Sequence, residues 1–227
     1  WYAKEFSIDH DLMQQDVLLV LERTRISHVW INGKDCGAQN SLCTSHSYDI
    51  TKYVQTGVNQ LVILVDNKNY PVSGGHMTSP DTQTNWNGIL GQISLEFVPK
   101  IRLTDIQLYP SITDACVQVR AVFLGNNCKI KAFIQNGSKD YAVQSFDICS
   151  TNVEFTYKVN APITPWSEHS PVIYTMVVEL YDGVKLLDTY LEQFGFRDFR
   201  ARNNKFVLNG EEVYLRGKHD GLLFPKT

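Results

Sequence analysis

Apolar and polar residues alternate along most of this chain with a period of two. In one clear stretch Val153, Phe155 and Tyr157 are apolar, and polar residues fill the positions between them. Successive side chains of a β-strand point to opposite faces of a sheet, so this period predicts half-buried antiparallel strands. The best helical candidate, residues 9–17, places its apolar residues on mixed faces. The pattern therefore predicts an all-β protein without long helices and excludes a parallel βαβ fold for residues 1–200.

Turn signals separate these alternating runs at intervals of about 8 to 12 residues, the spacing typical of β-sandwiches. Asn-Gly pairs stand at 32–33, 136–137 and 209–210, and this dipeptide is the strongest short-range signal of a two-residue hairpin. Trp30 comes just before the first of these turns and is expected to anchor the core or the space between two sheets. In the last hairpin the expected strands are 206–208 and 213–215.

Two changes in pattern predict domain limits. A strand that ends at Val98 is followed by Pro99, and a new alternating run begins at Ile101. Farther along, the apolar triplet 194–196 gives way to the polar segment 197–204. Proline interrupts strand pairing, and polar linkers join domains. The expected divisions are a sandwich at 1–98, a second sandwich at 99–196 and a separate segment at 197–227.

Composition and charge narrow the classes of function. The 227 residues carry a formal net charge of -3 without a cluster of Lys and Arg, so nucleic acid is not an expected partner. No apolar run approaches the roughly 18 residues of a membrane span, and none is expected. The cysteines form no CxxC pair and the histidines lack metal-ligand spacing, which predicts no disulfide framework, metal or other cofactor. The five cysteines are Cys36, Cys43, Cys116, Cys128 and Cys149.

A set of short motifs follows the order found in a known enzyme family. They are Trp-Tyr at 1–2, Val-Trp-Ile-Asn-Gly-Lys at 29–34, Tyr-Asp-Ile-Thr at 48–51, Asn-Trp-Asn-Gly-Ile at 85–89, Trp-Ser-Glu-His-Ser-Pro at 166–171, Phe-Gly-Phe-Arg at 194–197 and Leu-Arg-Gly at 215–217. In these motifs the chain resembles glycoside hydrolase family 2, which includes β-galactosidases, β-glucuronidases and β-mannosidases. The resemblance implies a jelly-roll sugar-binding-type sandwich, an immunoglobulin-like sandwich and a stub of the first strand of a (β/α)₈ barrel.

The resemblance also implies a function. A retaining glycosidase uses an acid/base carboxyl group and a nucleophilic one about 5 to 5.5 Å apart. The resemblance places both on later barrel strands, and no residue of this chain corresponds to either. The chain is therefore expected to be the non-catalytic N-terminal part of a retaining exo-glycoside hydrolase, β-galactosidase-like, that removes terminal sugars from oligo- or polysaccharides. Alone it is expected to be inactive, and its substrate class predicts a periplasmic or extracellular location.

Two candidate substrate contacts lie in the long polar segment 74–86. In family members this segment reaches the mouth of the barrel and offers an aspartate to a sugar hydroxyl, and Asp81 is the acidic residue available for that role. Trp86 offers an indole face on which a sugar can stack. The alternatives are an aspartate that is solvated or caps its own loop, and a tryptophan that packs between domains.

The other two candidates are His219 and Asp220, at the C-terminal end of the presumed barrel strand, where barrel active sites form. Asp220 can accept hydrogen bonds from sugar hydroxyls, and His219 can donate one or orient it. The alternative is a polar pair with structural bonds only. Many family members carry Asn, Arg, His or Glu after the Arg-Gly pair, whereas this chain has Lys218 and then His219, so the sugar is not assigned.

A rival class fits the same pattern of strands. Two tandem sandwiches also describe a non-catalytic carbohydrate-binding protein or an adhesion-type protein, and neither needs a barrel. The final hairpin discriminates, because such a protein has no need of an extra apolar segment such as 222–224 after its second sandwich. Homo-oligomerisation is left open.

Overall fold

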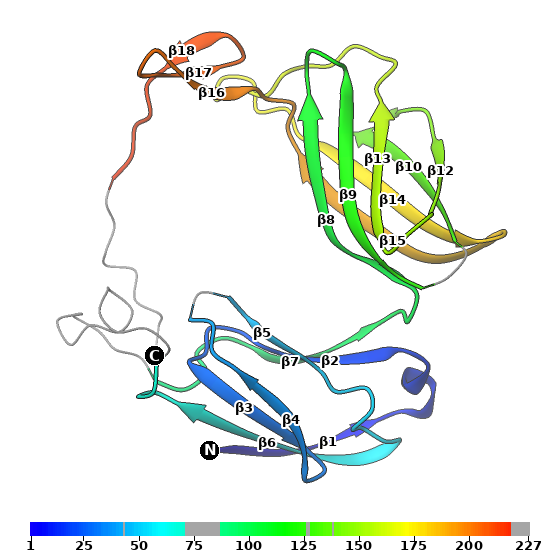
Figure 1. Cartoon of the computed structure of the whole chain (residues 1–227), viewed down its shortest axis with the longest axis vertical. Coiled ribbons are helices and arrows are strands. Elements are labelled where there is room, and N and C mark those ends of the chain that lie inside the picture. The colour runs from blue at the N-terminus through cyan, green and yellow to red at the C-terminus, as the bar shows by residue number, and fades with distance from the viewer. Residues whose placement is uncertain (43, 71–86, 126–127, 138, 219–227) are drawn as a thin grey trace. The chain divides into compact units, whose positions relative to one another are not determined.

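The structure is a computed structural model that describes residues 1–42, 44–70, 87–125, 128–137 and 139–218 (Figure 1). It divides into two compact units, the first comprising Trp1–Lys100 and the second beginning at Ile101. The all-β prediction is confirmed, since the elements of the described chain are strands apart from one short 3₁₀ helix. Every strand pair of the described chain is antiparallel. The helical candidate at 9–17 forms only a short 3₁₀ helix, η1 (His10–Gln14), and its last two residues begin a strand.

The first unit is a sandwich of two antiparallel sheets. One sheet has the order β1-β6-β3-β4 and the other has the order β5-β2-β7, and the two face each other in Figure 1. The strands are β1 (Tyr2–Ile8), β2 (Asp16–Leu21), β3 (Ile26–Ile31), β4 (Lys34–Gln39), β5 (His46–Asp49), β6 (Gly57–Asp66) and β7 (Ile93–Val98).

Side chains at alternate positions of β2, β3 and β6 fill the core of this sandwich. Val17, Leu19 and Leu21 of β2 are each at most 1% exposed, as are Val29 and Ile31 of β3. Full burial of such a side chain contributes roughly 1.5–3 kcal/mol relative to leaving it exposed. The period-two pattern of the sequence therefore corresponds to burial on one face of each strand.

The prediction that Trp30 anchors the core is wrong. Val29 and Ile31 occupy the inward positions of β3, so the side chain between them lies on the outer face of the sheet. There the Trp30 ring stacks on His28 with ring centroids 4.0 Å apart and contacts Trp1 at 5.7 Å. Trp30 thus covers the outside of the sheet rather than the space between the sheets.

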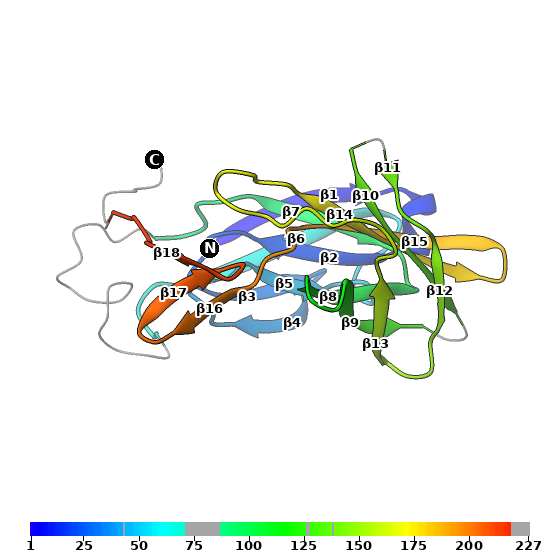
Figure 2. The same cartoon turned by 90° about the horizontal axis from the view of Figure 1, so that it is seen from above.

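The second unit is also a two-sheet sandwich. One sheet has the order β13-β9-β8, and the other has the order β11-β10-β14-β15 with β12 also paired to β10. Both views show the β14–β15 hairpin reaching past the other strands of its sheet (Figures 1 and 2). The strands are β8 (Arg102–Ser111), β9 (Cys116–Leu124), β10 (Lys129–Asn136), β11 (Lys139–Asp140), β12 (Gln144–Asp147), β13 (Asn152–Lys158), β14 (Tyr174–Asp182) and β15 (Lys185–Phe194).

The core of the second unit lies between these two sheets. Val153, Phe155 and Tyr157, whose alternation predicted a strand, are each at most 8% exposed. Tyr157 is almost fully buried, and its hydroxyl donates a 2.7 Å hydrogen bond to the carbonyl of Ala142. That bond matters because a buried hydroxyl without a partner costs free energy.

A small third sheet follows the sandwich, in the order β16-β17-β18, with strands β16 (Phe199–Arg202), β17 (Lys205–Leu208) and β18 (Glu211–Val213). The turn at Asn209 and Gly210 has φ values of 52° and 92°, which confirms the predicted hairpin turn. The predicted strand 213–215 is displaced, because pairing with β17 already ends at Val213. A barrel strand needs parallel neighbours, and the described chain contains none, so the barrel stub is not seen.

Asn32 joins three parts of the first sandwich through its side-chain amide. It occupies the β3–β4 turn at φ 52°. Its Nδ2 donates to the carbonyl of Tyr53 at 3.0 Å and to Oδ1 of Asn59 at 2.9 Å, while its Oδ1 accepts from the N–H of Gln60 at 2.9 Å. Asn59 is itself 1% exposed. A turn residue therefore carries hydrogen bonds that hold separate segments together.

Replacing Asn32 tests this network. Asn32→Gly keeps the freedom to adopt positive φ but removes three hydrogen bonds, so we expect a loss of about 2–3 kcal/mol in the free energy of unfolding. The control is Asn203→Gly, at φ 51°, which should change stability by less than about 0.5 kcal/mol. Denaturant unfolding measures both variants, and equal effects would contradict the proposed role of the Asn32 amide.

Candidate functional site

The four residues predicted to contact substrate, Asp81, Trp86, His219 and Asp220, lie outside the described residues. Their roles therefore stay predictions. The structure does describe the chain on either side of segment 71–86, and it also describes cavities of the second unit.

Hydrogen bonds hold the described residues that flank segment 71–86. The carboxylate of Asp66 accepts from the N–H groups of Lys68 at 2.8 Å and Asn69 at 3.1 Å, and the bond from Lys68 holds the pKa of Asp66 below its usual value, with the bonds from Asn69 lowering it further. On the other side, Oδ1 of Asn67 accepts from the N–H of Gly88 at 3.4 Å. The two flanks of the segment thus meet at one place in the first unit.

Tyr2 holds the returning flank, because its hydroxyl accepts from the N–H of Ile89 at 3.2 Å. Gly88 is required beside it, since its φ is 83° and a Cβ at this position would collide with the Tyr2 hydroxyl. Buried polar groups lie near the same flank: Thr24, which forms an isolated β-bridge with Ile89, has a buried Oγ1 without a partner among the described residues. Arg25 is 2% exposed.

A cluster of Ser27, His46 and Tyr48 has the residue types of a nucleophilic site but not the access. Ser27 Oγ lies 2.6 Å from His46 Nδ1 and 2.7 Å from the Tyr48 hydroxyl. All three residues are at most 4% exposed, so a substrate cannot reach the hydroxyl. The cluster satisfies buried polar groups, and we assign it a structural role.

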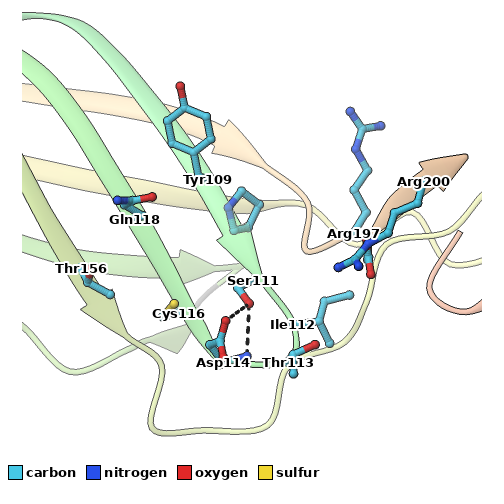
Figure 3. Close-up of a pocket in the computed structure, with 12 residues that line it drawn as sticks. Tyr109, Ser111, Ile112, Thr113, Asp114, Cys116, Gln118, Thr156, Arg197 and Arg200 are labelled. Carbon is cyan, nitrogen blue, oxygen red and sulfur yellow. Dashed lines mark hydrogen bonds and ion pairs between the residues drawn. The ribbon is translucent and has the colours of Figure 1, made fainter.

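The second unit contains a cavity of about 440 Å³ at the junction of β8, β9 and the segment 197–200 (Figure 3). Figure 3 shows Tyr109, Gln118 and Thr156 on the sheet side and Arg197 and Arg200 opposite them. Most of the charged groups in this cavity already form an ion pair or a hydrogen bond with a neighbouring residue. Arg200 Nε donates to the Asp198 carboxylate at 2.5 Å, and the Ser111 hydroxyl donates to Asp114 at 2.7 Å.

An adjoining cavity of about 570 Å³ shares Tyr109, Pro110 and Arg197 with the first and adds Trp166, Ile173 and Gln193, among others. We call the two cavities together the Arg197 groove. The Arg197 guanidinium lies over the Trp166 ring, 5.7 Å from its centroid, a weak cation–π contact at an exposed site. The groove therefore combines aromatic surface with amides and guanidinium groups.

Main-chain bonds fix Trp166 in this groove. Its N–H donates to the carbonyl of Phe196 at 2.7 Å, and its carbonyl accepts from Asn209 Nδ2 at 2.9 Å. The Trp166 side chain packs so closely on Gly195 that a Cβ there would lie 2.9 Å from Trp166 Cβ. The glycine of the Phe-Gly-Phe-Arg motif is thus explained by close packing.

Within the described residues, no group of three or more His, Cys, Asp or Glu side chains is placed to hold a metal ion. No helix in the part of the chain that the structure describes is long and apolar enough to span a membrane.

Comparison with known proteins decides the family. Residues 1–99 match the family described as "Glycosyl hydrolases family 2, sugar binding domain", and residues 101–197 match "Glycosyl hydrolases family 2". The chain belongs to glycoside hydrolase family 2. The sequence resemblance is therefore confirmed, together with the two sandwich domains that it implied.

Relatives of this family 2 chain include several named enzymes. It is 23% identical over 224 residues to a β-galactosidase of Lactobacillus delbrueckii subsp. bulgaricus and covers 22% of that protein. It is 27% identical over 231 residues to a putative β-glucuronidase of Formosa agariphila and covers 27% of the length of that protein. In both comparisons at least 95% of this chain is matched. The chain thus spans only about a quarter of the length of these relatives.

Solved structures show the same fold. A β-glucuronidase from Ruminococcus gnavus in complex with uronic isofagomine superimposes with a TM-score of 0.76 at 20% identity, over 96% of this chain and 38% of that one. A family 2 member from Bacteroides cellulosilyticus gives a TM-score of 0.76 at 20% identity, over 95% and 29%. At this identity the likeness concerns the fold alone.

Sequence reasoning did not identify the Arg197 groove in this family 2 chain. Trp166 and Arg197 both belong to quoted motifs, but they lie 31 positions apart and nothing in the sequence shows that they touch. Tyr109 follows the ordinary alternation of its strand and gives no separate signal. The groove depends on the packing of Gly195 against Trp166, which a single sequence does not display.

Gly195→Ala tests that packing. The added methyl group must displace Trp166, so we expect a loss of about 1–3 kcal/mol in the free energy of unfolding and a shifted Trp166 indole N–H signal in NMR spectra. Gly217→Ala is the matched control, because a Cβ there has no neighbour within 4 Å. An unshifted indole signal in the Gly195 variant would show that Trp166 does not pack as described.

Proposed function

We propose that this chain is the non-catalytic N-terminal part of a retaining exo-glycoside hydrolase that removes a terminal galactose or glucuronate from oligo- or polysaccharides. One observation carries the proposal: two family 2 matches occupy residues 1–99 and 101–197 in succession, while the chain covers only 22% and 27% of named β-galactosidase and β-glucuronidase relatives. The proposed domain limits are 1–98, 99–196 and 197–227.

The catalytic carboxyl groups belong, in this proposal, to a barrel that is not within these residues. Retaining hydrolysis needs one carboxyl group as acid and base and a second as nucleophile. The sandwiches then support the barrel and present loops to its mouth, where binding residues on a rigid scaffold are commonly found.

Asp81, Trp86, His219 and Asp220 are the proposed substrate contacts of the whole enzyme. The bonds around Asp66, Asn67 and Ile89 support this assignment, because they hold both flanks of the segment that bears Asp81 and Trp86. A carboxylate accepts hydrogen bonds from sugar hydroxyls, and an indole covers an apolar sugar face. A polysaccharide substrate also favours the proposed periplasmic or extracellular location.

The test of the proposal is turnover of aryl glycosides. We expect the 227-residue chain to release no nitrophenol from 4-nitrophenyl β-galactoside or β-glucuronide, because in this proposal the proton donor and the nucleophile belong to the barrel. A protein in which the same residues are followed by a family 2 barrel should hydrolyse one of the two substrates, and Asp81→Ala in that protein should lower kcat/KM by about tenfold or more.

The control for this experiment is the barrel-bearing protein with both catalytic carboxyl residues changed to the corresponding amides, which should be inactive. Turnover by the 227-residue chain alone would overturn the non-catalytic assignment. If the barrel-bearing protein hydrolyses neither aryl glycoside, the β-galactosidase or β-glucuronidase proposal fails.

A further inference from the structure

We propose that the Arg197 groove of the second sandwich is a saccharide-binding site for a sugar that carries a carboxylate. The proposal rests on the proposed function in one respect, the carbohydrate class of the ligand. The site itself is inferred from the groove's surface, charge and hydrogen-bonding groups, all of which lie within the second unit.

Exposed aromatic and aliphatic surface lines the groove. Tyr109 is 44% exposed and Ile173 is 45% exposed, and Trp166 of the same lining is half-buried and held by hydrogen bonds to its main chain. Ligand sites combine such apolar surface with a few placed polar groups. A sugar ring presents a face of C–H groups that suits this surface, with hydroxyl groups around its edge.

Polar side chains at the edge of this surface can bond to hydroxyl groups. Gln118 donates from Nε2 to the Glu154 carboxylate, which leaves its Oε1 as an acceptor. Thr156 offers a hydroxyl on the neighbouring strand, since it pairs with Gln118. Gln193 adds an exposed amide on the other side. Amides and hydroxyls both donate and accept, as hydroxyl-rich ligands require.

The charges of the groove indicate an anionic substituent. Arg200 is paired with Asp198, and Arg120, whose guanidinium lies over the Tyr109 ring, is paired with Glu154. Arg197 forms no ion pair among the described residues, and it is the one charged side chain in the described lining of the cavity that contains Trp166. A guanidinium presents a planar fork that matches a carboxylate.

Other ligand classes fit less well. Asp114 and Asp198 also line the groove, and two carboxylates repel a densely charged polyanion such as nucleic acid. A saccharide with a single carboxylate near Arg197 avoids that repulsion. The groove thus selects for charge at one position and for hydroxyl groups elsewhere.

The experiment measures binding of tetrasaccharides in which one residue is galacturonate or glucuronate and the other three are neutral sugars to the 227-residue chain by calorimetry and NMR. Their methyl esters serve as matched neutral ligands with the same ring faces. We expect at least one acid to bind about tenfold more tightly than its ester, with shifts in the side-chain amide signals of Gln118 and Gln193. Higher salt should weaken binding of the acid and leave the ester unchanged.

Variants locate the site. Arg197→Gln should lower affinity for the acid by about tenfold and leave the ester unaffected, whereas Tyr109→Ala should weaken both ligands. Arg202→Gln, an equal change of charge on exposed β16 outside the groove, should change neither. Thermal unfolding checks that each variant is folded, and Arg197→Lys, which keeps the charge without the fork, should bind the acid with intermediate affinity.

Several outcomes would overturn this inference. These are no binding by any acid at 10 mM ligand, equal binding of acid and ester, or unchanged affinity in the Arg197→Gln variant. The binding experiment does not measure hydrolysis, so such a failure would not bear on the proposed glycosidase function. That function is tested by aryl glycoside turnover alone.

Discussion

Asparagine amides at turns with positive φ join segments of this protein that are distant in the sequence. Asn32 and Asn209 both have φ 52°, which asparagine adopts more readily than most residues. The first amide bonds to Tyr53, Asn59 and Gln60 in the first sandwich. The second bonds to the N–H of Asp198 and to the carbonyl of Trp166, so it links the small third sheet to the residue on which Arg197 lies.

Much of the fold follows from alternation, because burial on one face leaves a visible period in the sequence. Trp30 shows where this reasoning fails. Residues 29–31 are apolar at three consecutive positions, and a period of two then does not show which face points inward. The pairing of β3 with β6 decides which face of β3 is buried, because it places Val29 and Ile31 opposite the inward residues Ile63 and Leu61.

The third sheet and the groove needed information that one sequence does not contain. The β16–β17 turn uses Asn203 and Asn204 at φ 51° and 62°, a two-residue turn without the glycine of the Asn-Gly pairs at 32–33 and 209–210. The strand expected at 213–215 was predicted from the Asn-Gly turn, but the strand that pairs with β17 begins directly after that turn at Glu211 and ends at Val213. The sequence shows that the four predicted substrate contacts have side chains suited to binding a sugar. Their geometry is not established, because all four residues lie outside the described chain.

The saccharide site that we propose on the second sandwich would have a physical use in the proposed glycosidase, whose proposed substrates include polysaccharides. When one part of a long chain is held, the other parts stay at a high effective concentration near the same protein, without any new contact at the catalytic centre. Tight binding would slow release between successive cleavages. In the proposed site Arg197, which forms no ion pair among the described residues, would provide one strong contact with a carboxylate, and the surrounding aromatic surface and amides would provide weaker contacts that exchange rapidly.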